Sequence, residues 1–266
     1  MSARVLITGA SGGIGTVAVA ELRARGARVV GLDLEADEAG GVLVCDLRDP
    51  AAVERAVEAA AERLGGLDVL INNAGLGIPQ SAGRAPDDGA LAVLEVNLIA
   101  PWRVTAAALA HLRASHGRVV NVASGLAHLS VPFATAYCMS KRGLVAYSDA
   151  LRLEHGDEIT VTTVYPGYIR TGIHAASTQS GVGLEGAVPA ERVEDAARAL
   201  ARAALGRPVR DLATTRAGTL QYFLARRSPR RLLDRITNRA VRRMVRNGRF
   251  TDGGLGRDLA TRLSAR

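Results

Sequence analysis

A glycine-rich run between an apolar stretch and a helical pattern is the feature that most constrains the fold of this chain. Residues 4–8 have the length and composition of a buried strand, and the segment Gly9-Ala10-Ser11-Gly12-Gly13-Ile14-Gly15 leads from them into a helical pattern that continues to Arg25. Glycines at such a turn let the chain reverse tightly and let the helix pack close to the strand. The run therefore predicts a strand, a tight turn and a helix that together begin a parallel sheet.

Apolar stretches of strand length alternate with helical patterns along most of the remaining chain. These stretches are rich in Val, Ile and Leu, which is typical of strands buried on both faces. We expect further strands at 28–33, 41–46, 68–72, 118–123 and 160–165, and helices ending near 64, 114, 155 and 205. The alternation predicts an α/β fold, a Rossmann-like doubly wound parallel sheet with helices on both faces, in a single domain.

Two segments depart from this alternation. Residues 172–189 are rich in Gly, Ser, Ala and Thr without a clear period, so we expect a mobile loop of the kind that covers a binding site. After a candidate last strand at 208–213, residues 226–266 carry 13 arginines and three acidic residues. We therefore predict a main domain over residues 1–225 and a basic extension over residues 226–266.

Composition and charge exclude several classes of protein. The net charge of +8 lies in the extension, since residues 1–225 hold 21 basic and 23 acidic side chains, and no aromatic residues interleave with the arginines to stack on bases. Cys45 and Cys138 have no CxxC spacing and the five histidines form no ligand pattern, so no disulfide and no metal site are expected. A strand begins at Arg4 without a signal-like leader, and no apolar run approaches the roughly 18 residues of a membrane helix. We expect a cytoplasmic protein that binds no nucleic acid.

The glycine-rich turn is also suited to holding a dinucleotide. Gly9 permits the tight turn, Gly13 lets a pyrophosphate approach the backbone, and Gly15 lets helix and strand pack closely. The N–H groups at the start of the helix would carry the phosphate charge. The residues predicted to contact a cofactor at this turn are Gly9, Ser11, Gly13, Ile14 and Gly15.

An acidic residue at the end of the second expected strand indicates which dinucleotide binds. Asp33 lies 18 residues after Gly15, where a carboxylate accepts hydrogen bonds from the adenosine ribose hydroxyls and repels a 2′-phosphate. Glu35 adds negative charge, and the glycine-rich turn contains no basic residue. NAD is therefore predicted over NADP. The strand ends predicted to line the adenosine half are Asp46, Leu47, Asn73, Ala74 and Gly75.

The chain contains a single lysine, Lys141, among 34 basic residues, and it lies four positions after Tyr137. Residues four apart on a helix share one face, so the phenol and the ammonium would point together into whatever that helix borders. An ammonium is a compact charge, whereas guanidinium is a wide planar fork that stays charged. The spacing therefore indicates a site that requires lysine, although such a pair on its own is more often a pair of surface neighbours.

These features together resemble the short-chain dehydrogenase/reductase family, in its compact single-domain branch. The resemblance covers roughly residues 4–205 and implies an oxidoreductase that transfers a hydride between NAD and a secondary alcohol or ketone of an apolar small molecule. By this resemblance the catalytic residues are Asn97, Ser124, Tyr137 and Lys141. It also implies that the cofactor contacts Tyr137, Lys141, Pro166, Gly167, Ile169 and Thr171.

The expected catalytic roles agree with the chemistry of the side chains. Tyrosine has a pKa near 10, so Tyr137 can act as general acid/base near neutral pH only if a positive charge such as that of Lys141 stabilises its phenolate. Ser124 would hydrogen-bond the substrate oxygen where negative charge develops. By the resemblance, Asn97 is expected to hold a water molecule that connects Lys141 to solvent as a proton relay.

The C-terminus departs from the family pattern. Many members end in a strand and a Val-Asp-Gly-Gly turn at a tetramer axis, whereas this chain continues into the extension, as hydroxysteroid and retinol dehydrogenases do. A homodimer or homotetramer is still expected. The alternative function is a non-catalytic NAD-sensing protein on the same fold, which would not need all four catalytic side chains. The sugar-nucleotide epimerase branch normally requires a longer chain.

The extension contains one clear helical pattern, from Pro229 to Arg246. Its apolar residues recur every three or four positions and arginines fill most of the rest, which makes a basic amphipathic helix. One interpretation is a helix on an anionic membrane surface. We favour the other, in which the apolar stripe covers the substrate pocket or a partner subunit, because the stripe is short and lacks Trp and Phe. Accordingly, we expect no binding to anionic vesicles near physiological salt.

Overall fold

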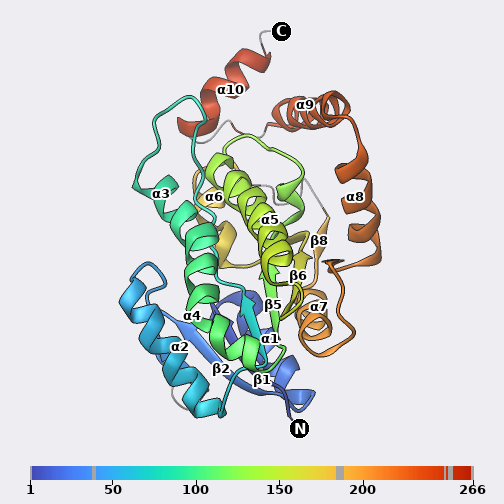
Figure 1. Ribbon diagram of the computed structural model, residues 1–266. Coiled ribbons are helices and arrows are strands. Elements are labelled where there is room, and N and C mark those ends of the chain that lie inside the picture. The colour runs from blue at the N-terminus through green and yellow to red at the C-terminus, as the bar shows by residue number, and fades with distance from the viewer. Residues whose placement is uncertain (1, 38–39, 184–188, 249, 251–253, 265–266) are drawn as a thin grey trace.

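Seven parallel strands form one sheet in the computed structural model, which describes residues 2–37, 40–183, 189–248, 250 and 254–264. Their order is β3-β2-β1-β4-β5-β6-β9, so the strand order reverses direction beside β1 (Figure 1). In α/β sheets, ligands bind at the carboxyl ends of the strands at such a reversal. The strands are β1 Arg4–Thr8, β2 Arg28–Asp33, β3 Val42–Val44, β4 Val69–Asn72, β5 Arg118–Val122, β6 Thr160–Tyr165 and β9 Asp211–Ala213.

Helices cover both faces of the sheet, as the sequence predicts. Side chains alternate along β1: Val5 and Ile7 pack with helices α1 (Gly13–Ala24) and α7 (Val193–Leu205), whereas Leu6 packs with the layer on the other face. The strands are buried on both faces because both layers are apolar where they meet the sheet. The helices of the second layer are α2 Pro50–Leu64, α4 Ala100–Ala114 and α5 Thr135–His155.

The expected helix ending near residue 114 is three consecutive segments. Helix α3 (Asp88–Leu94) passes into a π-helical turn, η1 (Glu95–Ile99), and then into α4. The π turn contains Asn97, whose side chain is fully buried. Such turns add one residue to a helical turn and occur frequently at functional sites.

One helical stretch, residues 88–114, is long and apolar enough to cross a membrane by length and composition alone. This differs from the expectation that no apolar run approaches that length. The stretch lies against α2 and α5, and Val104 and Leu112 are fully buried. It therefore serves as part of the helical layer that covers the sheet.

The segment expected to be a loop at 172–189 contains regular structure. A 3₁₀ turn, η3 (Gly172–His174), leads into α6 (Ala175–Gln179), and the short strands β7 (Tyr168–Ile169) and β8 (Ala190–Glu191) pair in parallel at either side. Residues 184–188 of this segment lie outside the described residues.

Three helices follow β9 and form the C-terminal part of the molecule (Figure 1). They are α8 (Arg216–Arg227), α9 (Arg230–Arg246) and α10 (Gly254–Ser264), and a 3₁₀ turn, η2 (Gly125–Ala127), lies earlier, after β5. The sequence pattern predicts α9, which begins directly after Pro229, but not α8 or α10. β9 lies within the candidate last strand and pairs with β6.

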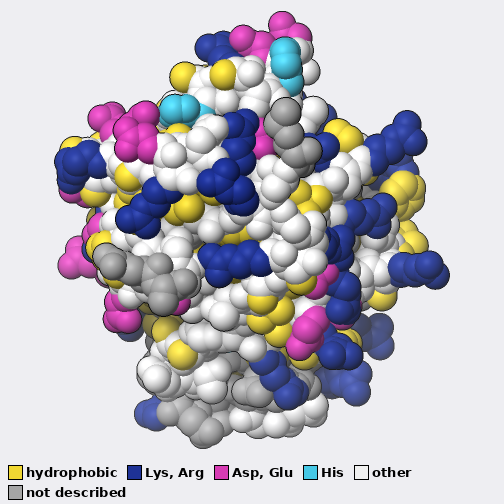
Figure 2. Space-filling model, turned by 90° about the horizontal axis from the view of Figure 1, so that it is seen from below, with side chains coloured by type: hydrophobic (Ala, Val, Ile, Leu, Met, Phe, Trp, Pro, Cys, Tyr) yellow, Lys and Arg dark blue, Asp and Glu magenta, His cyan; other side chains and the backbone are white. Residues whose placement is uncertain are grey.

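Arginine side chains lie at several places on the face of the molecule seen in Figure 2. On the face seen in Figure 2, dark blue side chains gather along the right edge, the side on which Figure 1 places α7 and α8, with yellow side chains between them. On α8, Leu220 and Phe223 are exposed, and the Arg227 guanidinium lies 3.9 Å from the centre of the Phe223 ring.

Candidate active site

A cavity of about 1080 Å³ extends from the glycine-rich turn, past the carboxyl ends of the central strands, to helices α8 and α9. Most of the residues that the sequence predicts for the site line this one cavity. They are Gly9, Ser11, Gly13, Ile14, Gly15, Asp33, Asp46, Leu47, Asn73, Ala74, Gly75, Ser124, Tyr137, Lys141, Pro166, Gly167, Ile169 and Thr171. Asn97 is the one predicted residue that is not among the lining residues.

Three glycines of the glycine-rich turn have no room for a side chain. Gly9 has a φ of +67°, and a Cβ there would lie 2.8 Å from the Cα of Ala74. A Cβ on Gly15 would overlap the carbonyl of Gly9, and one on Gly13 would lie 2.7 Å from Thr171 Cγ2. We call the glycine-rich turn and the start of α1 the glycine cradle. The first N–H groups of α1 face it without intrahelical partners. The residues present therefore fit a dinucleotide whose pyrophosphate rests at the start of α1.

The Asp33 carboxylate is fixed at the end of the cavity where the sequence predicts the adenosine half of the cofactor. It accepts hydrogen bonds from the backbone N–H of Ser11 and of Leu34, each at 2.8 Å. Glu35 is exposed and is not among the lining residues, so its expected contribution to cofactor choice has less structural support than that of Asp33.

Asp46 has a partner that the sequence analysis missed. Arg48 Nη2 lies 2.7 Å from Asp46 Oδ2, and both residues line the cavity. The hydrogen bond from the Arg48 guanidinium holds the pKa of the Asp46 carboxyl below its usual range. A carboxylate two positions before an arginine is a signal that could have suggested this pair.

The turn after β4 is tied to the glycine-rich turn by hydrogen bonds. Asn73 Nδ2 donates to the carbonyls of Thr8 and Gly9, at 3.0 and 3.1 Å, and the Thr8 hydroxyl accepts from the N–H groups of Asn73 and Ala74. Asn73 therefore holds the cradle through its side chain, and Ala74 approaches it through its backbone.

Tyr137 and Lys141 lie one turn apart on α5 and both face the cavity. Lys141 Nζ lies 5.9 Å from the centre of the Tyr137 ring and donates to the Val122 carbonyl at 2.9 Å. Ser124, which follows β5, hydrogen-bonds with the Tyr137 phenol. The structure thus brings three of the four predicted catalytic side chains together at one wall.

Burial is the largest influence on the pKa of both side chains of this pair. It raises the pKa of the Tyr137 phenol, and the hydrogen bond with Ser124 lowers that pKa by less. Burial also lowers the pKa of the Lys141 ammonium to about 8. The charge of Lys141 is not among the causes of the raised phenol pKa, and the stabilisation of the phenolate by this lysine stays a prediction.

Asn97 occupies a different position from the other three. Its Oδ1 accepts from the Leu76 N–H at 2.7 Å, and its Nδ2 donates to the Leu76 carbonyl at 2.9 Å and to Ser140 Oγ at 3.2 Å. The amide thus joins the π turn to the chain after β4 and to α5. Only the second lone pair of Oδ1 is open to the water molecule expected from the family resemblance.

The far wall of the cavity comes from the C-terminal helices. Apolar residues of α9 line it, which agrees with the favoured interpretation of the amphipathic stripe. The sequence analysis missed the contribution of α8. The residues of this helix that line the cavity are small residues and a tyrosine, which form no repeating apolar pattern in the sequence. The lining residues from these helices and the segment after α9 are Ala217, Gly218, Tyr222, Ala225, Ile236, Thr237, Ala240, Val241, Met244 and Phe250.

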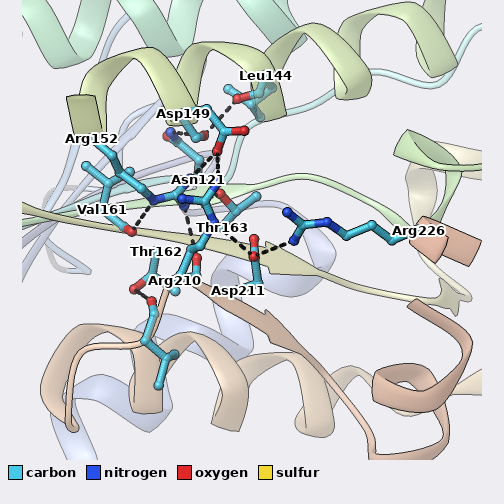
Figure 3. Close-up of polar contacts among 12 residues, drawn as sticks. Asn121, Leu144, Asp149, Arg152, Val161, Thr162, Thr163, Arg210, Asp211 and Arg226 are labelled. Atoms are coloured by element: carbon cyan, nitrogen blue, oxygen red, sulfur yellow. Dashed lines mark hydrogen bonds and ion pairs between the residues drawn. The ribbon is translucent and has the colours of Figure 1, made fainter. Parts of the chain in front are cut away.

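Polar contacts attach this wall to the edge of the sheet (Figure 3). Arg226 of α8 lies 3.2 Å from Asp211 of β9, whose carboxylate also accepts from the Tyr165 hydroxyl at 3.0 Å. The rings of Tyr165 and Tyr222 lie 4.3 Å apart. Figure 3 also shows Arg152 of α5 donating to the Val161 carbonyl, which fixes α5 to β6.

Among the residues that the structure describes, no group of three or more His, Cys, Asp or Glu side chains could hold a metal ion. Cys45 and Cys138 are both buried and free.

Comparison with known proteins gives consistent matches. Residues 3–181 match the family model of the short chain dehydrogenases. The chain is 31% identical over 201 residues to the 3-oxoacyl-(acyl-carrier-protein) reductase FabG of Escherichia coli, a match that covers 71% of this chain and 82% of the relative.

Two crystal structures of short chain dehydrogenases from Burkholderia cenocepacia, both in complex with NADP, are also similar. One is 30% identical, with a TM-score of 0.68, and the match covers 79% of this chain and 95% of that one. The other is 24% identical, with a TM-score of 0.74, over 88% of this chain and 97% of that one, and it shows likeness of fold alone.

Proposed function

Because the chain belongs to the short-chain dehydrogenase/reductase family and is an oxidoreductase, we propose that it transfers a hydride between NAD(H) and a secondary alcohol or ketone of an apolar small molecule. The observation that carries this proposal is the wall formed by Ser124, Tyr137 and Lys141, which faces the same cavity as the glycine cradle. When bound, the nicotinamide supplies the hydride to a ketone or accepts it from an alcohol.

Tyr137 is the general acid/base of the proposed reaction. Its phenol donates a proton to the ketone oxygen during reduction and takes it back from the alcohol during oxidation. Ser124 holds the substrate oxygen close to the phenol and stabilises the negative charge that develops there. Lys141 contributes its positive charge from the buried side of the phenol, where a low local dielectric strengthens the interaction.

NAD is proposed as the cofactor because the Asp33 carboxylate is held at the adenosine end of the cavity by two backbone N–H groups. A 2′-phosphate would meet that negative charge. The relative of 30% identity binds NADP, and Arg48 lies near this end of the cavity, so NADP is measured beside NAD in every assay.

The substrate is proposed to be apolar because three apolar residues of α9 line the wall opposite the glycine cradle. They are Ile236, Val241 and Met244. The relative named a 3-oxoacyl-(acyl-carrier-protein) reductase supports the direction from ketone to alcohol. We also propose that the enzyme acts in the cytoplasm as a homo-oligomer.

The test is turnover by the whole protein. Secondary alcohols of increasing apolar size are incubated with NAD or NADP, and ketones with NADH or NADPH, while reduced nicotinamide absorbance is followed. We expect turnover with NAD(H) that Tyr137→Phe abolishes while NAD still binds, since the ring remains and only the hydroxyl is lost. A Tyr137→Phe variant that keeps more than about a tenth of the activity, a barrier change under roughly 1.4 kcal/mol, would contradict the role of Tyr137. A wild type that binds NAD but turns over nothing would favour the NAD-sensing alternative.

A further inference from the structure

The Glu191 carboxylate lies where the cofactor side of the cavity meets the C-terminal helices. Glu191 belongs to β8, pairs with Ile169 of β7, and lines the cavity. Its Oε2 accepts the backbone N–H of Gly167 at 3.0 Å. The Thr215 hydroxyl donates to its Oε1 at 2.8 Å, and the Thr214 hydroxyl donates to its Oε2. One side chain thus receives three hydrogen bonds from two separate segments.

Two glycines let both segments approach this carboxylate closely. A Cβ on Gly167 would lie 2.7 Å from Glu191 Cδ, and a Cβ on Gly218 would lie 3.2 Å from Glu191 Oε1. At the first distance the Glu191 carboxylate would have to shift to admit a side chain, and the second distance leaves little room for one. The backbones on either side are therefore packed directly against Glu191.

The two segments belong to different parts of the site. Gly167 follows β6, within the residues that match the family model, and faces the cofactor side of the cavity. Thr215 lies beyond the matched residues and is the N-cap of α8, where its hydroxyl accepts from the Gly218 N–H at 2.9 Å. We propose that Glu191 is a positioning residue that couples cofactor binding to the order of the apolar wall formed by α8 and α9.

The coupling follows from what each partner does. Cofactor contacts that fix the Gly167 backbone also fix the carboxylate that accepts its N–H, and hydrogen bonds to an ionised acceptor are strong. The same carboxylate holds the hydroxyl that caps α8, so a fixed Glu191 disfavours local opening of α8. Since binding linkage is reciprocal, an ordered wall also strengthens cofactor binding. This inference rests on the function proposed above, because it requires a nucleotide beside Gly167.

Limited proteolysis with trypsin reads the coupling directly. The arginines of α8 and α9 are trypsin sites that become accessible when these helices open, and the products are identified by mass spectrometry. In the wild type, saturating NAD should slow cleavage in residues 226–246 at least about fivefold, the lower end of typical coupling. In Glu191→Ala, with NAD binding verified by titration and saturated, protection should fall below about twofold.

Two further variants separate coupling from general loosening. Glu191→Gln keeps an oxygen that accepts from Gly167, so its protection should lie between those of the wild type and Glu191→Ala. Asp211→Asn weakens the ion pair with Arg226 without touching the Gly167 contact. Cleavage should therefore be faster both with and without NAD, while the factor by which NAD slows cleavage stays that of the wild type. Thr214→Val removes one hydroxyl donor and should lower protection even if Glu191→Ala does not fold.

Each outcome has a defined meaning. Full NAD protection in Glu191→Ala, or equal loss of protection in Asp211→Asn, would overturn the coupling. Bound NAD without protection in the wild type would also overturn it and leave the proposed function intact. A wild type that binds no nicotinamide nucleotide would instead contradict the proposed function. The attachment of α8 through Glu191 would then still be tested, because Glu191→Ala should speed cleavage in the absence of nucleotide. An unchanged cleavage rate would contradict this attachment.

Discussion

Lys141 sits in surroundings that suit lysine and exclude arginine. Its side chain is buried, and its Nζ donates to the Val122 carbonyl at 2.9 Å. A Cβ on Gly75 would lie 3.6 Å from Nζ, so the backbone also passes close to the ammonium. A guanidinium carries five donors in a wide fork and would need both more space and more acceptors.

The buried ammonium makes the free energy of unfolding depend on pH in the alkaline range. Burial lowers the pKa of Lys141 from 10.5 to about 8, so the folded state loses this proton at lower pH than the unfolded state does. The penalty for burying the charge is fully present below pH 8. Between about pH 8 and 10.5 the unfolded chain binds more protons, and the free energy of unfolding should rise by about 3 kcal/mol in total.

We expect this rise in the wild type and not in Lys141→Met, measured as the difference between their denaturation midpoints at pH 7, 9 and 10.5. The difference isolates Lys141 from other groups that titrate at high pH. A difference that does not change with pH would show that the lysine keeps its ordinary pKa in the folded protein.

Asp33 should set the cofactor preference. The wild type should bind NAD on the order of a hundredfold more tightly than NADP, because the fixed carboxylate would face a 2′-phosphate. Asp33→Arg should erode or reverse this ratio in nucleotide titrations. Glu35→Arg is the matched control: that side chain is exposed outside the cavity lining, so solvent screens it and the ratio should change much less. Equal dissociation constants in the wild type would contradict the prediction.

Among the elements, the junction of β1 and α1 depends on the absence of one Cβ. At Gly15 a methyl group would overlap the Gly9 carbonyl, so Gly15→Ala should lower the free energy of unfolding by about 1–3 kcal/mol through overpacking. Gly12→Ala is the control, because a Cβ there would lie an ordinary 3.5 Å from the same carbonyl and should change stability by less than about 0.5 kcal/mol. Chemical denaturation measures both, and equal effects would mean that the close approach is not needed.

The elements that the sequence predicts are those whose signal is local. The strands and the helices α1, α2, α5 and α7 follow from apolar period and from turn residues, and the glycine cradle follows from its place between β1 and α1. The π turn around Asn97 has no such signal, because one extra residue in a helical turn leaves composition and period nearly unchanged.

The candidate site shows the same division. Tyr137 and Lys141 are predictable because both lie on one helix, at a spacing that places them on one face. Glu191 is not predictable, because its partners Gly167 and Thr215 lie 24 residues away on either side and meet only in the folded chain. Tyr222 was missed for the related reason that its role depends on the cavity that it lines.

At the scale of the whole molecule, an apolar outer face remains on α4 and α5. Trp102 of α4 is 58% exposed and stacks on Tyr147 of α5, with ring centres 5.6 Å apart, and Met139 of α5 is 57% exposed. Exposed apolar side chains of this size, where they gather on one face, are typical of protein interfaces. This face is the one we expect a second copy of the chain to cover.

The expected homo-oligomer should therefore dissociate when this face becomes charged. Trp102→Glu should shift the protein toward monomer in sedimentation velocity, because a dimer would bury the new carboxylates without partners. Leu220→Glu, an exposed leucine on α8, is the matched control and should leave the oligomer intact. If only the α8 variant dissociates, the interface lies on the C-terminal helices instead.

The contribution of α9 to the cavity bears on how such a chain can change over generations. Ile236 and Ala240 face the cavity from a helix outside the two core clusters that flank the sheet, so replacing them leaves the packing around the sheet untouched. Substitutions at such positions seldom cost much stability, whereas those in the sheet usually do. New substrate preferences can therefore accumulate on α9 while the reaction machinery is inherited unaltered, which makes this helix the natural place to begin directed evolution.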